Sequence, residues 1–524
     1  MSKLCRPLSI VPALLTAFSA VAAHAAVPDE IQRMVGRERR FQHPDAVGEW
    51  YANRNFEPVW VEGTVLTPAG ESAITVLRSY IPHGIDPDIV HADVLNDLWN
   101  DFEEGRYDDE RAAEFDAMIS DALLSLAHEL FYDNSANRPA ELATAQEWRA
   151  AAYSPLLDAC MINCEEAFQP LWPVMIPYVN LTAALERYRA LQAQGGWPEL
   201  DSEVEPGSEP SLILGLRARL ALEGYIEDVG TEVWDEALST AVRRYQDAHH
   251  ISPPVDRVGP STLRSLNTPI EERLAAIVVT MDHLRESGRG TQGRGESIWV
   301  NVAGFSVEVW EDTSRLFRTR AIVGSTSDQG INRTPLFADE MERIEVNPIW
   351  YPPARLARQL RLSREDGIVR RNGRIIQLPG PGNPMGKVKF LFPNHHAVYL
   401  HDTSNPRLFE RTVRAFSSGC IRTDRPLELA TLLISRDQGR DPEEVSAWIE
   451  GILQTDETEV VRLQQVLPVY LEYFTVWVAD DGIVEFYGDI YGYDRAAVRE
   501  VSRRRDVALP ENDEESSESA DASR

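Results

Sequence analysis

The apolar residues of this chain change their spacing near residue 297, and that change limits what the chain can fold into. Before it, apolar side chains recur at helical spacing, with leucine at every fourth position across 212–220. After it, they alternate with polar residues, as in 305–309. A period near 3.6 is typical of helices and a period of 2 is typical of strands. The pattern therefore predicts a multidomain α+β protein with a helical N-terminal part and a mostly β C-terminal part.

The length of 524 residues fits three or four domains at about 150 residues each. A polar, basic excursion at 353–386 interrupts the β pattern, and we interpret it as a flap over a site. Asp424 is expected to cap a following helix. The predicted segments are a signal peptide at 1–25, a helical scaffold domain at 26–207, a three-helix domain at 208–270, a scaffold helix with a Gly-rich linker at 271–296, a mostly β domain at 297–504 and a disordered acidic tail at 505–524.

The net charge limits the partners of this chain, and its N-terminal residues indicate the compartment in which it acts. A formal net charge of −31 argues against nucleic acid and anionic membrane surfaces as partners. Lys3 and Arg6 precede a short apolar run at 8–22, and small residues at 23–25 fit signal-peptidase cleavage. The alternative, an uncleaved anchor, needs a run of about 20 apolar residues. We therefore predict an exported protein without a transmembrane segment.

Removing the signal peptide leaves three cysteines, Cys160, Cys164 and Cys420. In an oxidising compartment an odd count suggests one disulfide and one free thiol. Cys160 and Cys164 are the natural pair, but an i,i+4 pair on a regular helix is too far apart for a disulfide, so a bridge would need a distorted helix. Cys420 is then the unpaired thiol.

Cys420 follows His401 by 19 residues and has the surroundings of a nucleophile. An imidazole can take the thiol proton and later return it to a leaving amine. Gly419 allows a tight turn in which its own N–H and that of Cys420 point at one developing oxyanion. Tyr399 shares the strand face of His401 and is a possible further oxyanion donor. The backbone carbonyl of Asp402 is the candidate to orient the imidazole, because its side chain points to the other face.

Other interpretations remain open from these residues alone. Arg422 either holds a substrate carboxylate or forms a structural ion pair. A single Cys and His are by default a buried inert thiol and a surface imidazole. A zinc peptidase is a more distant alternative, because the adjacent pairs His249-His250 and His395-His396 lack the spacing that places ligands on one face. We predict no metal site and no cofactor.

The segment from His401 to Arg422 resembles the YkuD-type L,D-transpeptidases, whose pattern is a histidine, a gap of this size and Ser/Thr-x-Gly-Cys-Ile/Val-Arg. The branch is the large, YcbB-like one. The further segments that resemble it are Arg333-Thr334-Pro335, Asn347-Pro348-Ile349-Trp350, Leu400-His401-Asp402-Thr403, Asp489-Ile490-Tyr491-Gly492-Tyr493-Asp494 and, in the scaffold domain, Trp50-Tyr51-Ala52-Asn53-Arg54, Pro58-Val59-Trp60 and His83-Gly84-Ile85-Asp86-Pro87. Residues 208–268 resemble a peptidoglycan-binding domain, with Asp256-Arg257 in place of the usual Asp-Gly.

The resemblance implies a periplasmic enzyme that acts on peptidoglycan stem peptides. Cys420 would attack the diaminopimelate carbonyl of a donor tetrapeptide, release D-alanine and form a thioester. An amine of an acceptor stem would then attack the thioester and form a 3→3 crosslink. His401 would be the base, the excursion at 353–386 the substrate-capping lid, and carbapenem-type β-lactams inhibitors that acylate the same thiol. The implied substrate-binding residues are Ser418, Arg422, Trp350 and Asn347.

Two alternatives to this function stay open at the level of sequence. The same acyl-enzyme can be resolved by water, by a protein lysine or by a D-amino acid, which gives a carboxypeptidase, an anchoring enzyme or an exchange enzyme. A catalytically silent wall-binding scaffold, in which Cys420 is a relic, is the alternative from another class.

Overall fold

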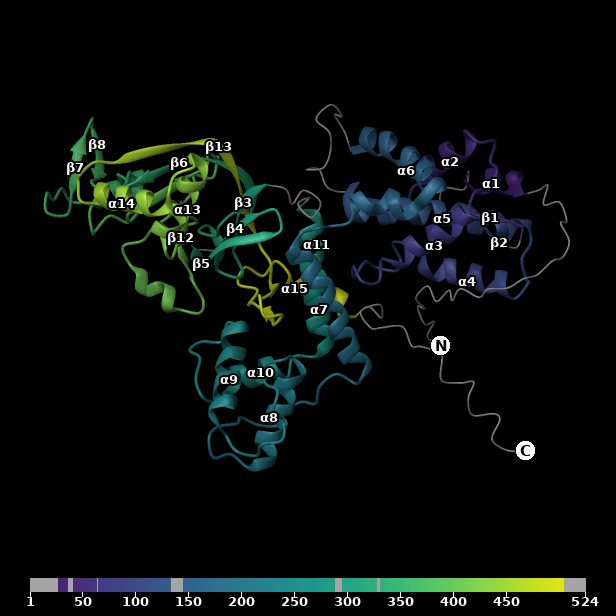
Figure 1. Cartoon of the computed structure of the whole chain (residues 1–524), viewed down its shortest axis with the longest axis horizontal. Helices are drawn as coiled ribbons and strands as arrows, with labels where there is room; N and C mark the ends of the chain where they lie inside the picture. Colours follow the sequence, from purple (N-terminus) through teal and green to yellow (C-terminus); the bar gives the residue numbers. More distant parts are fainter. Residues whose placement is uncertain are drawn as a thin grey trace. The chain divides into compact units, whose positions relative to one another are not determined.

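The structure is a computed structural model that describes residues 27–35, 41–63, 65–132, 145–287, 295–327 and 330–503. The predicted signal peptide, residues 288–294 of the predicted linker and the predicted acidic tail lie outside these residues. The chain forms two compact units, and each is described by itself (Figure 1). The first contains Met1–Trp197, Thr268–Gly293 and Ala496–Arg524, and the second Pro198–Asn267 and Arg294–Arg495.

The first unit is helical and is built around α5 (Asp109–Ala127), which is buried along nearly its whole length. Asp108 caps this helix by accepting a hydrogen bond from the N–H of Arg111 at 2.9 Å. Helix α11 (Ile270–Glu286) packs against α7 (Ile176–Ala193). The other elements are α1 (Val27–Val35), α2 (Pro44–Ala52), β1 (Val61–Glu62), β2 (Val65–Leu66), α3 (Pro68–Arg78), α4 (Ala92–Glu103), η1 (His128–Tyr132), α6 (Ala145–Phe168), η3 (Gln169–Leu171) and α15 (Arg495–Val501), which crosses the boundary between the units.

A buried carboxylate explains the tryptophan-rich segments near the N-terminus. Asp116 of α5 accepts hydrogen bonds from the N–H groups of Trp60 at 2.6 Å and Val61 at 2.9 Å. It also accepts from the hydroxyl of Tyr51 at 2.6 Å. Trp50 and Trp60 stack with ring centroids 5.9 Å apart and are almost fully buried. These segments therefore hold the helices of the first unit together and carry no reactive group.

The two predicted partner cysteines lie in α6, where the helix is distorted. Cys160 and Cys164 are fully buried and are free thiols in this structure. Asn163, between them, has the non-helical dihedral angles φ −160° and ψ 103°. The distortion that a bridge would require is thus present, whereas the bridge suggested by the odd count is not.

The second unit contains a nine-stranded sheet among its described residues, in the order β11-β5-β12-β10-β9-β6-β13-β3-β4. Strand β4 also pairs with β5, so the sheet closes on itself. Helices α13 (Pro426–Gln438) and α14 (Pro442–Leu453) pack against each other, and their apolar residues join the core of the sheet. The strands are β3 (Glu296–Asn301), β4 (Ser306–Glu311), β5 (Ser314–Gly324), β6 (Phe337–Val346), β9 (Val388–Leu391), β10 (Leu400–His401), β11 (Ala415–Ser417), β12 (Ile421–Thr423) and β13 (Glu459–Glu472), and η5 (Pro406–Glu410) precedes β11.

The predicted helix cap at Asp424 is wrong. Helix α13 begins at Pro426, and its N-cap is Arg425 with φ +55°. The carboxylate of Asp424 instead accepts hydrogen bonds from Arg320 at 2.7 and 3.0 Å. A nearby guanidinium on β5 therefore outcompetes the backbone N–H groups of the helix for this carboxylate.

Three helices form a smaller core in the same unit: α8 (Pro210–Leu222), α9 (Glu236–Ala248) and α10 (Pro260–Leu266). Their core includes Val204, which pairs with Val258, so this region begins earlier than the predicted residue 208. Ile483 joins the same core from the hairpin of β14 (Val476–Val478) and β15 (Val484–Phe486). The late hairpin predicted around 480–482 is confirmed, and it packs against the three helices.

The excursion at 353–386 contains the short helix α12 (Ala354–Ala357) and a hairpin of β7 (Ile368–Arg371) and β8 (Arg374–Gln377). A bridge between Trp350 and Gln377 ties the hairpin to the end of β6. Figure 1 shows the hairpin at the outer end of this unit. We call residues 353–386 the lid. Among the described residues, none of the helices combines the length and the apolar character needed to cross a bilayer.

Candidate active site

Three neighbouring strands bring the predicted catalytic residues together. His401 of β10 pairs with Arg422 of β12 in parallel register and with Lys389 of β9 in antiparallel register. Directly paired residues project to the same face of a sheet, and so do residues two apart in one strand. Tyr399 and Cys420, two residues before His401 and Arg422, lie beside each other because the N–H of Ile421 donates to the carbonyl of Tyr399 at 3.1 Å. The thiol, the imidazole, the phenol and two cations therefore share one region.

Cys420 is a free, half-buried thiol at the end of a glycine turn. Its Sγ lies 3.8 Å from the carbonyl oxygen of Ala397 and interacts with the hydroxyl of Tyr399. Burial raises the pKa of the Cys420 thiol, whereas Tyr399 and the charges of Lys389 and Arg422 lower it. Burial and the Cys420 charge raise the pKa of Tyr399, so the phenol keeps its proton and can donate it to a sulfur anion.

The imidazole of His401 is buried and is a neutral base. Burial, followed by the positive charge of Arg422, lowers the pKa of His401 from 6.5 to about 3. The backbone carbonyls of Asp402 and Pro384 face the ring and favour its protonated form, although Nδ1 has no hydrogen bond within 3.5 Å to the described residues. At neutral pH the ring is therefore ready to accept a proton.

The side chain of Asp402 fastens the lid to the catalytic strand. Its carboxylate accepts hydrogen bonds from the N–H groups of Lys387 at 2.7 Å and Thr403 at 2.6 Å. Gly386 packs so closely on this carboxylate that only glycine fits there. The C-terminal root of the lid thus contacts Asp402 through residue 386 and His401 through the Pro384 carbonyl. A movement of the lid root would reach the imidazole directly.

The turn before the nucleophile is held by residues from two other segments. Gly419 has φ +111°, a conformation that favours glycine. Its carbonyl accepts a hydrogen bond from the hydroxyl of Thr334 at 2.9 Å, and the same hydroxyl accepts from the N–H of Gly324 at 2.8 Å. The phenol of Tyr491 accepts from the N–H of Thr334 at 3.0 Å. The motifs around 334 and 491 therefore position the nucleophile and do not react.

The predicted oxyanion donors are placed differently from one another. The N–H of Gly419 donates to the hydroxyl of Ser417 at 3.1 Å, so it is already engaged in this structure. That hydroxyl also donates to the carbonyl of Cys420 at 2.5 Å. The N–H of Cys420 makes no hydrogen bond to another described backbone or side-chain atom. The geometry thus favours the N–H of Cys420, with the Tyr399 phenol, as the donors at an oxyanion.

The four predicted substrate-binding residues separate into different roles. Ser418 is exposed beside the thiol, and Trp350 lies half-buried at the start of the lid. Arg422 is half-buried, its Nε is without a hydrogen-bond partner, and no carboxylate within the described residues lies within ion-pairing distance of it. Asn347 instead donates its side-chain amide to the carbonyls of Thr455 at 2.8 Å and Glu457 at 3.0 Å. That gives Asn347 a structural role rather than the substrate contact predicted for it.

Lys389 was not found from the sequence. Its Nζ lies 4.2 Å from the ring centroid of Tyr399, and its positive charge lowers the pKa of the Cys420 thiol. Burial lowers the pKa of Lys389, whereas the charge of Glu345, its partner across β6 and β9, raises it. A lone lysine 12 residues before a histidine carries no sequence signal. Only the pairing of β9 with β10 brings it to the site.

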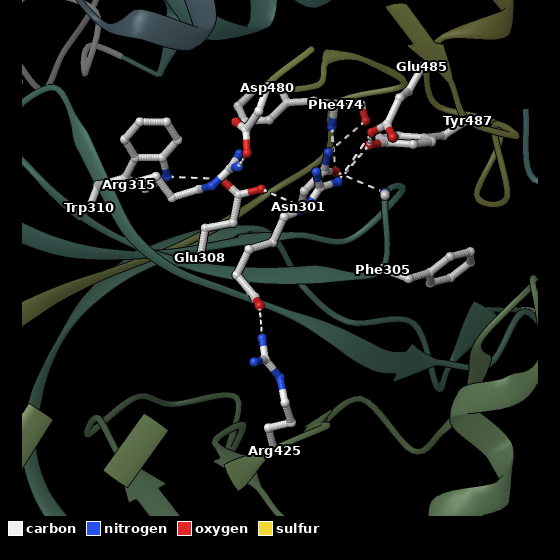
Figure 2. Close-up of polar contacts among 12 residues, drawn as sticks. Asn301, Phe305, Glu308, Trp310, Arg315, Arg425, Phe474, Asp480, Glu485 and Tyr487 are labelled. Carbon is white, nitrogen blue, oxygen red and sulfur yellow. Dashed lines mark hydrogen bonds and ion pairs between the residues drawn. The ribbon is translucent and has the colours of Figure 1, made fainter. Parts of the chain in front are cut away.

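A hollow of about 760 Å³ lies elsewhere in the second unit, and neither Cys420 nor His401 lines it. Its charged groups largely neutralise one another (Figure 2). Arg315 pairs with Asp480, and Arg318 contacts Glu485 at 3.2 Å and Glu308 at 3.3 Å. These pairs tie the β14–β15 hairpin to β4 and β5. We therefore assign this hollow a structural origin and place the candidate active site at Cys420.

The histidine pairs do not resemble a metal centre. His249 stacks on Tyr245 with ring centroids 3.9 Å apart, and His250 stacks on Tyr487 at 4.5 Å. The rings of His395 and His396 lie 3.9 Å apart against Phe337. No cluster of three or more His, Cys, Asp or Glu side chains in the described ranges is arranged to hold a metal ion.

Comparison with known proteins defines the two main parts of the chain. Residues 295–445 match the L,D-transpeptidase catalytic domain (YkuD), and residues 45–185 match a scaffold domain. A Haemophilus influenzae protein named "Putative L,D-transpeptidase" is 29% identical over 231 residues, which are 38% of this chain and 44% of that protein. The aligned region thus spans less than half of this relative.

Solved structures with low similarity include two bacterial L,D-transpeptidases. The one from Xylanimonas cellulosilytica is 16% identical, covers 52% of this chain and 99% of its own, and has a TM-score of 0.18. The one from Stackebrandtia nassauensis is 14% identical, covers 52% of this chain and 96% of its own, and has a TM-score of 0.22.

The catalytic domain and the site define an enzyme of the acyl-transfer class. The chain contains an L,D-transpeptidase catalytic domain of the YkuD family and, before it, a scaffold domain. The resemblance seen around Cys420 is confirmed, as are the helical scaffold region and the mostly β catalytic domain.

Proposed function

We propose that this protein is a periplasmic peptidoglycan L,D-transpeptidase that forms 3→3 crosslinks between diaminopimelate residues. The observation that carries the proposal is the free Cys420 thiol directly before β12, the strand that pairs with the strand of the neutral imidazole of His401. A thiol beside a base is what nucleophilic acyl transfer requires. The L,D-transpeptidase catalytic domain supplies the class of substrate, a stem peptide of the cell wall.

In the first half-reaction His401 takes the proton of Cys420 as the sulfur attacks the carbonyl carbon of diaminopimelate in a donor tetrapeptide. A C–S bond forms, and the carbonyl oxygen becomes an oxyanion held by the N–H of Cys420 and the Tyr399 phenol. The C–N bond to D-alanine then breaks, and the imidazolium returns the proton to the leaving amine. The carbonyls of Asp402 and Pro384 stabilise the imidazolium between these two steps.

In the second half-reaction the side-chain amine of an acceptor diaminopimelate attacks the thioester. A new C–N bond forms, the C–S bond breaks, and the proton lost by the amine passes through His401 to the sulfur. The enzyme is regenerated, and no cofactor takes part in this sequence. Carbapenem-type β-lactams would acylate the same thiol and stop at the thioester.

The cations beside the thiol fit an anionic donor. Arg422 and Lys389 flank His401 on neighbouring strands. Arg422 forms no ion pair with a described carboxylate, whereas Lys389 has Glu345 as its cross-strand neighbour on β6. The proposed donor carries carboxylates on both sides of the bond that breaks, on D-alanine and on the diaminopimelate side chain. Arginine and lysine bind carboxylates through charge-assisted hydrogen bonds. We assign these two side chains to donor binding, and the three helices within 208–270 to contact with the wall.

Incubating the purified protein with the tetrapeptide donor tests this function by intact mass spectrometry. We expect an adduct on Cys420 whose mass is that of the donor without D-alanine, followed by a 3→3 dimer when acceptor is added. Cys420→Ala should abolish both, and a folded Cys420→Ala protein serves as the control. A tripeptide, an exchanged D-amino acid or a lysine adduct as the main product would assign a different acceptor. No adduct would reject the enzyme.

A further inference from the structure

The lid is a basic surface on an acidic protein. It contains seven arginines, at 355, 358, 361, 364, 370, 371 and 374, and only two carboxylates, at 365 and 366, a net charge of +5. The whole chain has a net charge of −31. A local charge of opposite sign to the rest of the protein orients the molecule in the field of a charged partner. Anionic partners are therefore attracted to this end of the second unit.

The arginine side chains of the lid face solvent and are not neutralised within the protein. Those at 358, 361, 364, 370, 371 and 374 are all exposed. None of the six has a carboxylate within ion-pairing distance in the described part of the chain. Arg370 donates to the carbonyl of Gly373 at 3.0 Å, which leaves its charge uncompensated. By contrast, most of the exposed arginines that line the hollow described above form an ion pair with a carboxylate. Arg425, for example, pairs with Glu428.

The lid is also fixed to the catalytic strands at both ends. Its N-terminal end follows Trp350, which pairs with Gln377, and its C-terminal end leads through Gly386 into β9. The lid root contacts Asp402 and His401, as described above. A polymer bound by the lid would thus be held next to the thiol. A lid that served only to cover one peptide would not need six unpaired cations on its exposed surface.

We propose that the exposed arginines of the lid bind several carboxylates of the peptidoglycan polymer at once, beyond the stem peptide in the active site. This inference rests on the proposed function and extends it from one stem to the polymer. Guanidinium groups match carboxylates with paired hydrogen bonds. Each exposed pair contributes little, about 0.2–1 kcal/mol, or roughly 1.4-fold to fivefold in affinity. Six such contacts together give an effect of about tenfold or more.

The test is co-sedimentation of the full protein with insoluble peptidoglycan sacculi. The lid variants are Arg358/Arg361/Arg364→Gln and Arg370/Arg371/Arg374→Gln, separately and combined. The matched control replaces three arginines outside the lid, 407, 462 and 499, which are also exposed and without an ion pair in the described residues. We expect the combined lid variant to bind sacculi about tenfold more weakly, and the control to bind as the wild type does.

Two further measurements separate this idea from its rivals. Acylation of Cys420 by the soluble tetrapeptide, measured in the same variants, distinguishes loss of polymer binding from loss of the donor site. Loss of acylation together with sacculus binding would assign the arginines to the single stem and overturn the proposal. Sacculus binding should weaken from about 0.1 M to about 1 M NaCl, as the Debye length falls from about 10 Å to about 3 Å. Slow acylation by the wild-type protein would count against the proposed function, whereas sacculus binding by the lid variants would still test the present proposal.

Several outcomes would overturn the proposal. Unchanged sacculus binding by the combined lid variant is one, and equal losses in the lid and control variants are another. The lid also exposes Leu356 and Leu362, at 43% and 57% of their surface, which suits a lipid surface as well as a polymer. Loss of binding to phosphatidylglycerol vesicles, with sacculus binding intact, would therefore assign the lid to a membrane instead.

Discussion

Replacing Gly386 by alanine tests whether the lid root controls the catalytic strand. Gly386 has φ +63°, and an added Cβ would lie 2.4 Å from Cγ and Oδ2 of Asp402. The left-handed conformation costs a non-glycine residue about 1–2 kcal/mol. Displacing Asp402 would also remove its hydrogen bonds from Lys387 and Thr403, at about 1.5–3 kcal/mol each for a charged acceptor. The expected cost is about 4–8 kcal/mol.

Gly373→Ala is the matched control in the same lid. Gly373 has φ +78°, and an added Cβ would meet no atom within 4 Å. This substitution should therefore cost only the conformational part, about 1–2 kcal/mol. The difference between the two variants, about 3–6 kcal/mol, isolates the contact with Asp402.

Hydrogen–deuterium exchange at the amides of Lys387 and Thr403 measures this difference. At 1.4 kcal/mol for each factor of ten, Gly386→Ala should exchange these amides about 100-fold to 10,000-fold faster than Gly373→Ala. Acylation of Cys420 should slow in Gly386→Ala alone, because the Asp402 and Pro384 carbonyls move away from His401. Equal protection of the two amides in both variants would refute the assignment of Asp402 as the anchor of the lid root.

Three other predictions follow from the site. Because the pKa of His401 is about 3 rather than 6.5 and burial raises the pKa of Cys420, the rate of single-turnover acylation should rise with pH through neutrality without an inflection near 6.5. The same lowered pKa makes the neutral imidazole stabilise the fold above pH 6.5, and this stabilisation is lost as the pH falls toward 3. Lys389→Met should raise the pKa of the Cys420 thiol, because the lysine charge lowers it, and slow alkylation of the thiol at pH 7, with Lys389→Arg restoring the rate. Thr334→Val should leave the Gly419 carbonyl and the Gly324 N–H unpaired at about 1–3 kcal/mol each, lowering the melting temperature of the catalytic unit, whereas Thr334→Ser should not.

Some parts of the site could be predicted from the sequence because the residues that carry the chemistry lie close together along the chain. Cys420, its neighbouring Gly419 and the histidine at 401 occur in one short stretch, and a glycine beside a thiol is a local requirement of the turn. The change from helical to alternating spacing near 297 reported the two fold classes, because periodicity depends only on which face of each element is buried.

Other parts depended on partners that are far apart in the sequence. Asn347 was read as a substrate contact from its motif, but its amide meets the carbonyls of Thr455 and Glu457 more than 100 residues away. Asp424 was predicted to cap a helix, but its carboxylate accepts hydrogen bonds from the guanidinium of Arg320 instead. Neither interaction can be predicted from the residues that neighbour Asn347 or Asp424 in the sequence.

The amino-acid sequence by itself determined the nucleophile, the base and the class of fold, since these follow from residue types within a few turns of chain. Only the tertiary structure decided the electrostatics around the thiol. It brought Lys389 and Arg422 to either side of His401, because strand pairing joins residues by register and not by distance along the chain. It also buried His401 deeply enough to keep the imidazole neutral, and burial is a property of the whole core.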